Sequence, residues 1–182
     1  MTASPQPAIR SATLADAPAL AHLAEQTFRD AFADQNTPED LDLYCAGAFN
    51  EAQQLGEIRH LGIITLLMEQ ADLLVGYAQI KTTSASDRLA NEAQAELSRI
   101  YLRQEHHGRG LAQVLMAEVL ARAAGAGARV LWLGVWEHNP KAIAFYRKHG
   151  FEVVGEKTFL VGSDLQRDLV LSVELASPGG AA

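Results

Sequence analysis

Residues 96–116 read ELSRIYLRQEHHGRGLAQVLM: a partly alternating strand pattern, a short polar loop, and an apolar helix pattern that opens at Gly108. Gly108 and Gly110 can adopt unusual dihedrals and let a ligand approach the backbone closely. The first turn of a helix presents unpaired N–H groups and positive dipole character to one place. Arg109 can add a charge-assisted hydrogen bond. The stretch therefore favours an anion such as a pyrophosphate, although a plain glycine-containing turn would show the same pattern.

Residues 131–151 read LWLGVWEHNPKAIAFYRKHGF and form a second strand-to-helix pattern. Asn139 is a good N-cap residue, Pro140 suits the first helical position, and Gly150 follows the end of a helix predicted over 139–149. Tyr146 falls on this helix. From the pattern alone, an amphipathic tyrosine in the core is the simpler interpretation of Tyr146.

The whole chain predicts one domain over residues 8–175, with short tails at 1–7 and 176–182 that we expect to be disordered. Strand patterns cover 8–13, 62–69, 72–82, 95–103, 129–135, 151–161 and 165–175. Helices are predicted to start after Asp16, Thr37 and Gly108, and to cover 50–60 and 139–149; residues 83–93 are a polar loop. This order predicts an α/β (α+β mixed sheet) class, with a central mixed sheet and helices on both faces.

Charge and composition narrow the function. The chain has 182 residues, a formal net charge of −7 and one cysteine, Cys45. The acidic balance argues against a nucleic-acid partner, because phosphate binding needs a basic surface. No apolar run approaches membrane-spanning length, and the N-terminus shows no secretory pattern. We therefore expect a cytoplasmic protein that has neither a membrane nor nucleic acid as a partner.

The two strand-to-helix stretches together resemble the GNAT superfamily of N-acetyltransferases. Its first motif, Arg/Gln-x-x-Gly-x-Gly/Ala, is similar to His107, Gly108, Arg109, Gly110, Leu111 and Ala112, where His107 replaces Arg or Gln. Its second acetyl-CoA motif is similar to Asn139, Ala142, Phe145, Tyr146, Gly150 and Phe151. The resemblance covers residues 8 to 175 and implies the GNAT acyltransferase fold, a central twisted mixed sheet with helices on both faces.

The resemblance implies direct transfer of an acetyl group from acetyl-CoA to a primary amine, without a metal. It implies a cofactor site made of Ile100, Tyr101, Leu102, His107, Gly108, Arg109, Gly110, Leu111, Ala112, Asn139, Ala142 and Tyr146. A backbone N–H near Tyr101 or Leu102 would stabilise the oxyanion. Tyr146 would donate a proton to the departing thiolate. Cys45 lies far from both motifs in sequence, which disfavours a covalent acyl-thiol intermediate.

The attacking amine must lose a proton, because a lysine-like amine has a pKa of about 10.4. Glu96 is the candidate general base, since Glu96, Ser98 and Ile100 share one face of a regular strand. An acid that faces solvent at the strand start is an equal alternative. Glu92 and Glu137 are reserve candidates. The six histidines show no metal-ligand pattern, so no metal is expected.

Three further stretches resemble PaiA-type spermidine/spermine acetyltransferases: residues 32–44 (FADQNTPEDLDLY), 132–139 (WLGVWEHN) and 159–171 (FLVGSDLQRDLVL). This likeness implies a small-molecule amine, a polyamine such as spermidine or spermine. The candidate substrate-binding residues are Phe32, Asp40, Tyr44 and Trp136. Asp40 belongs to an acidic cluster with Asp34, Glu39 and Asp42, which a solvated helix face would equally explain. Core packing explains Trp136 at least as well.

Two other functions stay open at this point. One is a protein acetyltransferase that acts on an N-terminus or a lysine, and the other is a non-catalytic sensor that binds acyl-CoA. The presence of Tyr146 favours catalysis over the sensor. The sequence also leaves open the length of the acyl group and the oligomeric state, a homodimer included.

Overall fold

The computed structural model describes residues 6–83, 86, 89 and 93–176. The strands are β1 (Ala8–Ser11), β2 (Ile63–Gln70), β3 (Leu73–Lys81), β4 (Gln94–Leu102), β5 (Val130–Trp136), β6 (Glu152–Val161) and β7 (Asp164–Glu174). The helices are α1 (Ala17–Phe32), α2 (Pro38–Ala48), α3 (Glu51–Arg59), α4 (Leu111–Gly125) and α5 (Pro140–Lys148), with short 3-10 turns η1 (Leu14–Asp16) and η2 (Gln104–His106). The predicted order of strands and helices is confirmed.

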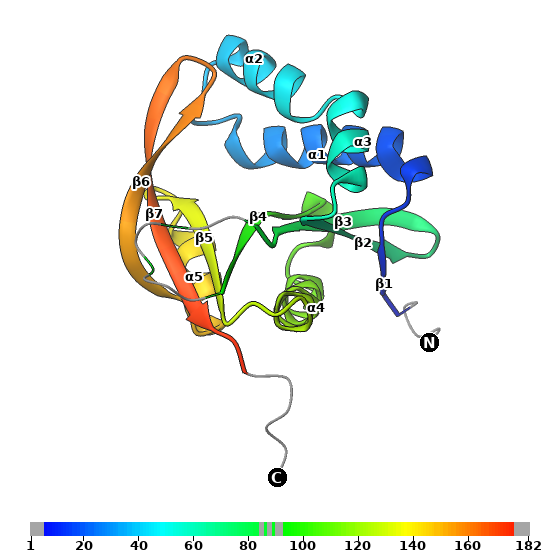
Figure 1. Cartoon of the computed structure of the whole chain (residues 1–182). Coiled ribbons are helices and arrows are strands. Elements are labelled where there is room, and N and C mark those ends of the chain that lie inside the picture. Colours follow the sequence, from blue (N-terminus) through cyan, green and yellow to red (C-terminus); the bar gives the residue numbers. More distant parts are fainter. Residues whose placement is uncertain (1–5, 84–85, 87–88, 90–92, 177–182) are drawn as a thin grey trace.

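In the described part of the chain, seven strands form one sheet in the order β1-β2-β3-β4-β5-β7-β6. Neighbouring strands are antiparallel except β4 and β5, which are parallel (Figure 1). A parallel pair needs a crossover connection, and α4 provides it. The predicted mixed sheet is therefore confirmed, and its one parallel pair lies at the centre.

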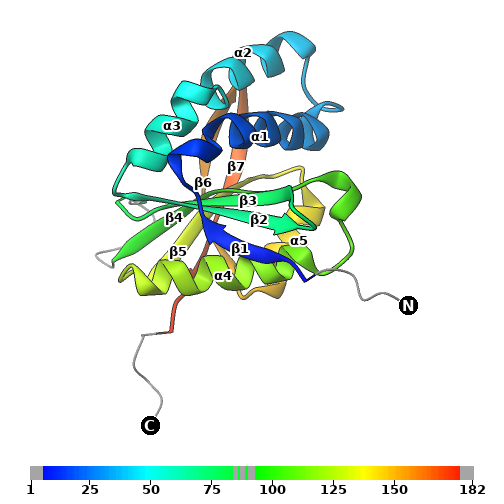
Figure 2. The ribbon, with the colours of Figure 1, turned by 90° about the vertical axis from the view of Figure 1, so that its right-hand side faces the viewer.

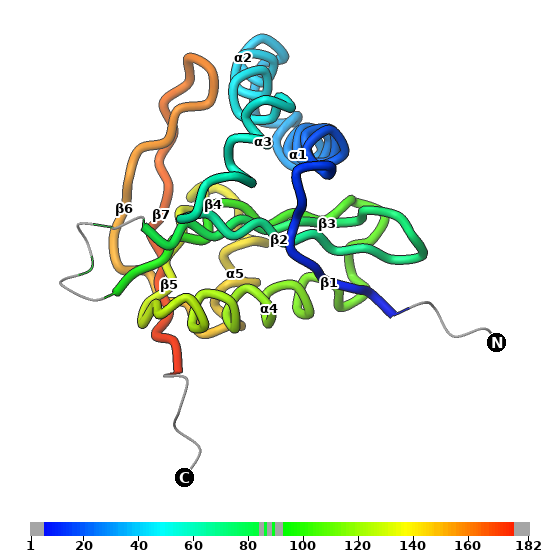
Figure 3. The backbone as a smooth tube through the Cα atoms, turned by 45° about the vertical axis from the view of Figure 1, so that its right-hand side comes forward, coloured from blue at the N-terminus to red at the C-terminus, as the bar shows by residue number. Residues whose placement is uncertain are grey.

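Helices cover both faces of the sheet, as predicted. Figures 1 and 2 show α1, α2 and α3 on one face and α4 on the other. One apolar core joins the sheet to α4 and α5 and includes Leu97, Leu115 and Leu131. A second core lies under α1 and α2 and includes Phe28, Leu67 and Tyr77. The tube view in Figure 3 shows the same layers, with α4 running beneath the strands.

A β-bulge in β4 changes which side chains share a face. Ile80 pairs with Leu97 and Gln79 with Arg99, so that Ser98 is the extra residue. Leu97 and Ile100 therefore both enter the core beside α4. Glu96 pairs with Trp132 and lies on the opposite face. The expectation that Glu96, Ser98 and Ile100 share one face is wrong, because strict alternation holds only without a bulge.

One predicted helix start and one predicted side-chain cap need correction, although α1 does begin directly after Asp16. The helix expected to open at Gly108 begins at Leu111, because Gly108 and Gly110 have φ values of +74° and +80°. Asp16 was expected to cap α1. It already has near-helical dihedrals after η1, and its carboxylate accepts from the backbone N–H of Thr13 at 2.7 Å. Thr37 caps α2 as predicted, accepting from the backbone N–H of Asp40 at 3.2 Å.

The expected tails and the loop over 83–93 fall largely outside the described residues. Glu92, a reserve candidate for the general base, also lies outside them. No helix within the described ranges is long and apolar enough to cross a membrane.

Candidate functional site

The parallel strands β4 and β5 separate partway along their length. Their ladder holds only three pairs, which join Gln94–Glu96 to Val130–Trp132. Beyond Glu96, no pairing between β4 and β5 is present in the described residues. A cavity of about 710 Å³ lies at this opening, and its lining comes from both faces of the sheet, with Phe28 from α1 and Tyr146 from α5. The gap therefore offers a route through the sheet to unpaired strand backbone.

The start of α4 forms one wall of the cavity. Gly108 and Gly110 both have positive φ, and a Cβ added at either would meet no atom within 4 Å. Gly110 is the N-cap residue and provides no side chain for the first backbone N–H groups of the helix. Those N–H groups therefore face open space and suit an anion. This is the geometry that the HGRGLA sequence predicted.

The histidine at the start of this loop has a role in its geometry. His107 Nε2 lies 3.0 Å from the carbonyl oxygen of Leu102. A carbonyl oxygen only accepts, so Nε2 must carry the proton of this hydrogen bond. The contact ties the glycine-containing loop to the end of β4, where the cavity lies.

Helix α5 contributes the opposite wall. Asn139 Oδ1 accepts from the backbone N–H of Ala142 at 3.0 Å, so the predicted N-cap is present. Tyr146 packs against Phe145 and Phe151, with ring centroids 5.5 Å and 5.8 Å away. Burial raises the pKa of Tyr146 well above its usual value. The phenol therefore stays protonated and can act as a donor.

Most residues expected to hold the cofactor line this one cavity. All of them do so except Arg109, which is exposed, and Leu111, whose side chain is buried in the core. Both catalytic candidates, Tyr146 and Glu96, also line it. The two sequence motifs, about thirty residues apart, thus converge on one space.

The other end of the cavity is rich in aromatic side chains. The candidate substrate-binding residues Phe32, Tyr44 and Trp136 line the cavity, together with Phe28 and Phe159. The rings of Phe28 and Tyr44 are stacked with centroids 4.6 Å apart, and Tyr44 lies 5.7 Å from Phe159. Rings in this arrangement suit an organic ammonium group.

Asp40 lies outside the cavity lining. Its Oδ1 accepts from the backbone N–H and the hydroxyl of Ser163, at 2.6 Å and 2.9 Å. These hydrogen bonds hold the pKa of Asp40 below its usual value. They fasten the tip of the β6–β7 hairpin, which rises beside α2 in Figure 1. Asp42, from the same acidic cluster, pairs with Arg29 at 2.7 Å.

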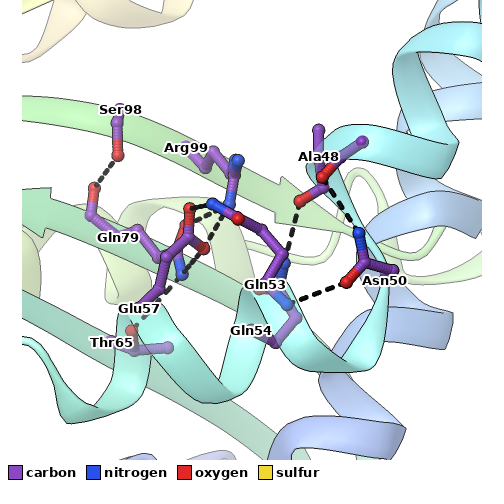
Figure 4. Close-up of polar contacts among 10 residues, drawn as sticks. Ala48, Asn50, Gln53, Gln54, Glu57, Thr65, Gln79, Ser98 and Arg99 are labelled. Atoms are coloured by element: carbon purple, nitrogen blue, oxygen red, sulfur yellow. Dashed lines mark hydrogen bonds and ion pairs between the residues drawn. The ribbon is translucent and has the colours of Figure 1, made fainter.

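Arg99 brings a positive charge to the cavity lining, and a buried network holds it (Figure 4). Its Nη1 donates to Glu57 at 2.7 Å and to Gln79 at 2.6 Å. The guanidinium also lies 5.1 Å from the ring centroid of Phe49. Gln79 donates in turn to Glu57 at 2.9 Å. The network joins α3 to β3 and β4 and orients Arg99.

Sequence reasoning missed the other charged residues of the lining, which are Asp30, Lys81, Arg99, Lys141, Lys157 and Asp168. For Lys157 and Asp168 the available signal was Gly134, because a glycine inside a strand marks close approach of another group. Glu137, a reserve base, does not line the cavity and forms an ion pair with Arg167. In the described ranges, no three His, Cys, Asp or Glu side chains are grouped as a metal site.

Comparison with known proteins agrees with this geometry. The model of the acetyltransferase (GNAT) family matches residues 18–151. An uncharacterized N-acetyltransferase from the pepI 3' region of Lactobacillus delbrueckii subsp. lactis is 32% identical over 160 residues, covering 88% of this chain and 92% of the relative.

Solved structures share the fold. The PaiA N-acetyltransferase of Thermoplasma acidophilum in complex with coenzyme A superposes with a TM-score of 0.75 at 21% identity, covering 93% of this chain and 99% of that one. The ribosomal-protein-alanine N-acetyltransferase of Brucella melitensis superposes with a TM-score of 0.69 at 27% identity, covering 92% and 99%.

Proposed function

The chain belongs to the GNAT family of N-acetyltransferases, and from that premise we propose that it transfers the acetyl group of acetyl-CoA to a small primary amine. The main support for this proposal is the cavity where β4 and β5 separate. It joins the open start of α4 to the aromatic side chains beside α1 and α2. One cavity can thus hold a donor and an acceptor together, as direct transfer requires.

The start of α4 fits the pyrophosphate of acetyl-CoA. The support is the open space in front of Gly108 and Gly110, since a Cβ there would meet nothing within 4 Å. Unpaired N–H groups at a helix start bind such anions. Backbone groups of β4 beyond Glu96 face the gap and can pair with the amide-containing arm. Acetyl-CoA supplies the activated thioester, and the remaining chemistry falls to this chain.

Three roles are proposed for the chain during transfer. A backbone N–H near Tyr101 or Leu102 donates to the acyl oxygen as negative charge develops there. Tyr146 holds a proton for the departing sulfur, and its raised pKa keeps that proton in place at neutral pH. A carboxylate of the cavity lining accepts a proton from the amine, and the lining holds three carboxylates, Asp30, Glu96 and Asp168.

A polyamine, spermidine or spermine, is the finer proposal for the acceptor. The acidic cluster on α2 does not support this proposal, because Asp40 lies outside the cavity lining. The support comes from the carboxylates that line the cavity, Asp30, Glu96 and Asp168. Aromatic rings beside them can bind methylene chains and ammonium groups. Lys81, Arg99, Lys141 and Lys157 also line the cavity, so the charge there is mixed. A protein N-terminus is the second candidate, favoured by the likeness to the ribosomal-protein-alanine N-acetyltransferase.

An assay of free-thiol release from acetyl-CoA separates these acceptors. The panel is spermidine, spermine, benzylamine and a peptide with a free N-terminal alanine. We expect turnover with the amines and a Michaelis constant for spermidine that rises with salt, because charge attraction is screened over about 8 Å at physiological ionic strength. Turnover with the peptide alone would replace the amine proposal with the protein one. No thiol release with any acceptor would refute the acetyltransferase proposal.

A further inference from the structure

Gly134 marks a crowded point on the face of the sheet that lines the cavity. A Cβ at Gly134 would lie 2.9 Å from Lys157 Nζ and 3.0 Å from Asp168 Oδ2. Lys157 and Asp168 are register partners on β6 and β7, and Asp168 is also the partner of Trp136 on β5. The missing side chain in β5 therefore makes room for one cation and one carboxylate from the neighbouring strands.

Lys157 is held in place from two sides. Its Nζ lies 3.8 Å from Glu96 Oε1 and 5.1 Å from the ring centroid of Trp132. Glu96 reaches this point because the bulge at Ser98 turns it away from the core beside α4. The lysine charge thus lies beside Glu96, and Gly134 leaves space for it next to Asp168.

Asp168 combines deep burial with access to the cavity. Only 7% of its surface is exposed, and it belongs to the cavity lining. Among the residues that the structure describes, its carboxylate has no hydrogen-bond partner. A buried titratable group that has a charged neighbour and opens into a cleft is a candidate functional group. The open lone pairs of Asp168 can receive a proton.

Lys157 from β6 and Tyr44 from α2 interact electrostatically with this carboxylate. The same cavity is also lined by Glu96 and Arg99 from β4, Lys81 from β3 and Asp30 from α1, while β5 contributes the uncharged Trp136. Burial raises the pKa of Asp168, and the charge of Lys157 opposes part of that rise. A carboxylate with a raised pKa is a stronger base. The difference between its pKa and that of an amine, about 10.4, is therefore smaller, which favours proton transfer.

We propose that Asp168 is the proton acceptor for the substrate ammonium group, and that Lys157, its register partner held beside Glu96, is the neighbouring cation that tunes it. This proposal rests on the proposed acetyltransferase function. One N–H bond of the ammonium breaks, one O–H bond forms on Asp168, and the electron pair stays on nitrogen. The neutral amine can then attack the acyl carbon, while Asp168 passes the proton to water in the cavity.

The test measures thiol release by Asp168→Asn with the fastest primary amine of the panel. We expect kcat/KM near pH 7 to fall by roughly 10²- to 10⁴-fold, the usual range for a general base. The deficit should shrink as pH approaches the pKa of the amine, because less of the amine then needs deprotonation. Acetyl-CoA affinity, measured by calorimetry, should not change. Glu174→Gln, an exposed change on the same strand, is the matched control and should match wild type.

The free energy of unfolding provides a second measurement. A purely structural role predicts that Asp168→Asn lowers it, whereas the proposed role predicts that the substitution raises it. With its pKa raised by burial, Asp168 binds more protons in the native state than in the unfolded chain over the window between the two pKa values. Stability then falls as pH rises through that window. Asp168→Asn removes this loss, so urea unfolding should show a more stable protein at pH 7, with the gain vanishing at acid pH.

The outcomes separate the two proposals. If wild type releases no thiol with any acceptor, the proposed function fails, and the Asp168 assignment fails with it. If wild type is active and Asp168→Asn keeps the wild-type kcat/KM and pH profile, only the Asp168 assignment is wrong. A loss of rate that is equal at every pH and accompanied by lower stability would reduce Asp168 to a structural residue, which also overturns the proposal.

Discussion

Substitution of Gly110 by alanine has two expected effects, backbone strain and weaker ligand binding. The two can be told apart by comparison with Gly127→Ala, because Gly127 lies at the other end of α4 with a similar φ. Gly110 has φ +80° and Gly127 has φ +88°, and a Cβ at either would meet no atom within 4 Å. Gly110 lines the cavity and Gly127 does not. The two positions therefore share the same strain on substitution and differ in their distance from the proposed pyrophosphate site.

Both Gly110→Ala and Gly127→Ala should lose stability by a similar amount. A left-handed L-residue costs roughly 1–2 kcal/mol. For a domain of about 150–250 residues, each kcal/mol lowers Tm by about 2–4 °C, so each variant should melt about 2–8 °C lower than wild type. Thermal unfolding followed by circular dichroism measures this loss.

Only Gly110→Ala should weaken acetyl-CoA binding. Its methyl group occupies the space that faces the first N–H groups of α4. Loss of one hydrogen bond to a charged group is worth about 1.5–3 kcal/mol, which corresponds to roughly 10- to 150-fold in Kd. Titration calorimetry with acetyl-CoA is the assay, and Gly127→Ala should bind as wild type does. If both variants melt lower and both bind with wild-type Kd, the start of α4 is not the pyrophosphate site.

Three further changes, one of them with a matched control, test the remaining roles. Tyr146→Phe should lower kcat by roughly 10²-fold with acetyl-CoA affinity unchanged; because burial raises the pKa of Tyr146, wild-type turnover should not fall through loss of this proton below pH values near 10. Cys45→Ala should keep turnover in the thiol-release assay, because burial raises the pKa of this thiol to about 11 and leaves it un-ionised; an inactive variant would revive an acyl-thiol intermediate. Glu57→Gln should cost about 3–5 kcal/mol in urea unfolding, since it leaves Arg99 buried without its ion partner. Glu156→Gln, at the exposed pair with Arg167, should cost less than about 1 kcal/mol, and equal losses would contradict the role of burial.

Local chemistry explains what was predictable. Glycine dihedrals and N-cap hydrogen bonds act within about four residues, so HGRGLA and the Asn139 cap could be read directly from the chain. Apolar periodicity likewise revealed the order of strands and helices. Two local details differ. Helix α1 begins directly after Asp16 as predicted, but the Asp16 carboxylate binds Thr13 in the preceding 3-10 turn and does not cap the helix. Helix α4 begins at Leu111, because Gly108 and Gly110 have positive φ.

Long-range pairing explains what was not predictable. The bulge at Ser98 turns Glu96 to the other face of the sheet, and its cause lies in the register with β3. Ser163, which is 123 residues away in the sequence, donates its backbone N–H to the carboxylate of Asp40. Asp168 reaches the cavity only because β7 inserts between β5 and β6.

The sequence by itself determined the family, the order of elements and the backbone geometry that suits an anion, because each depends on residues close together in the chain. Only the tertiary structure decided which carboxylates and cations face the acceptor. Pairing between distant strands sets that choice, and a shift of one residue in register moves a side chain to the opposite face of the sheet.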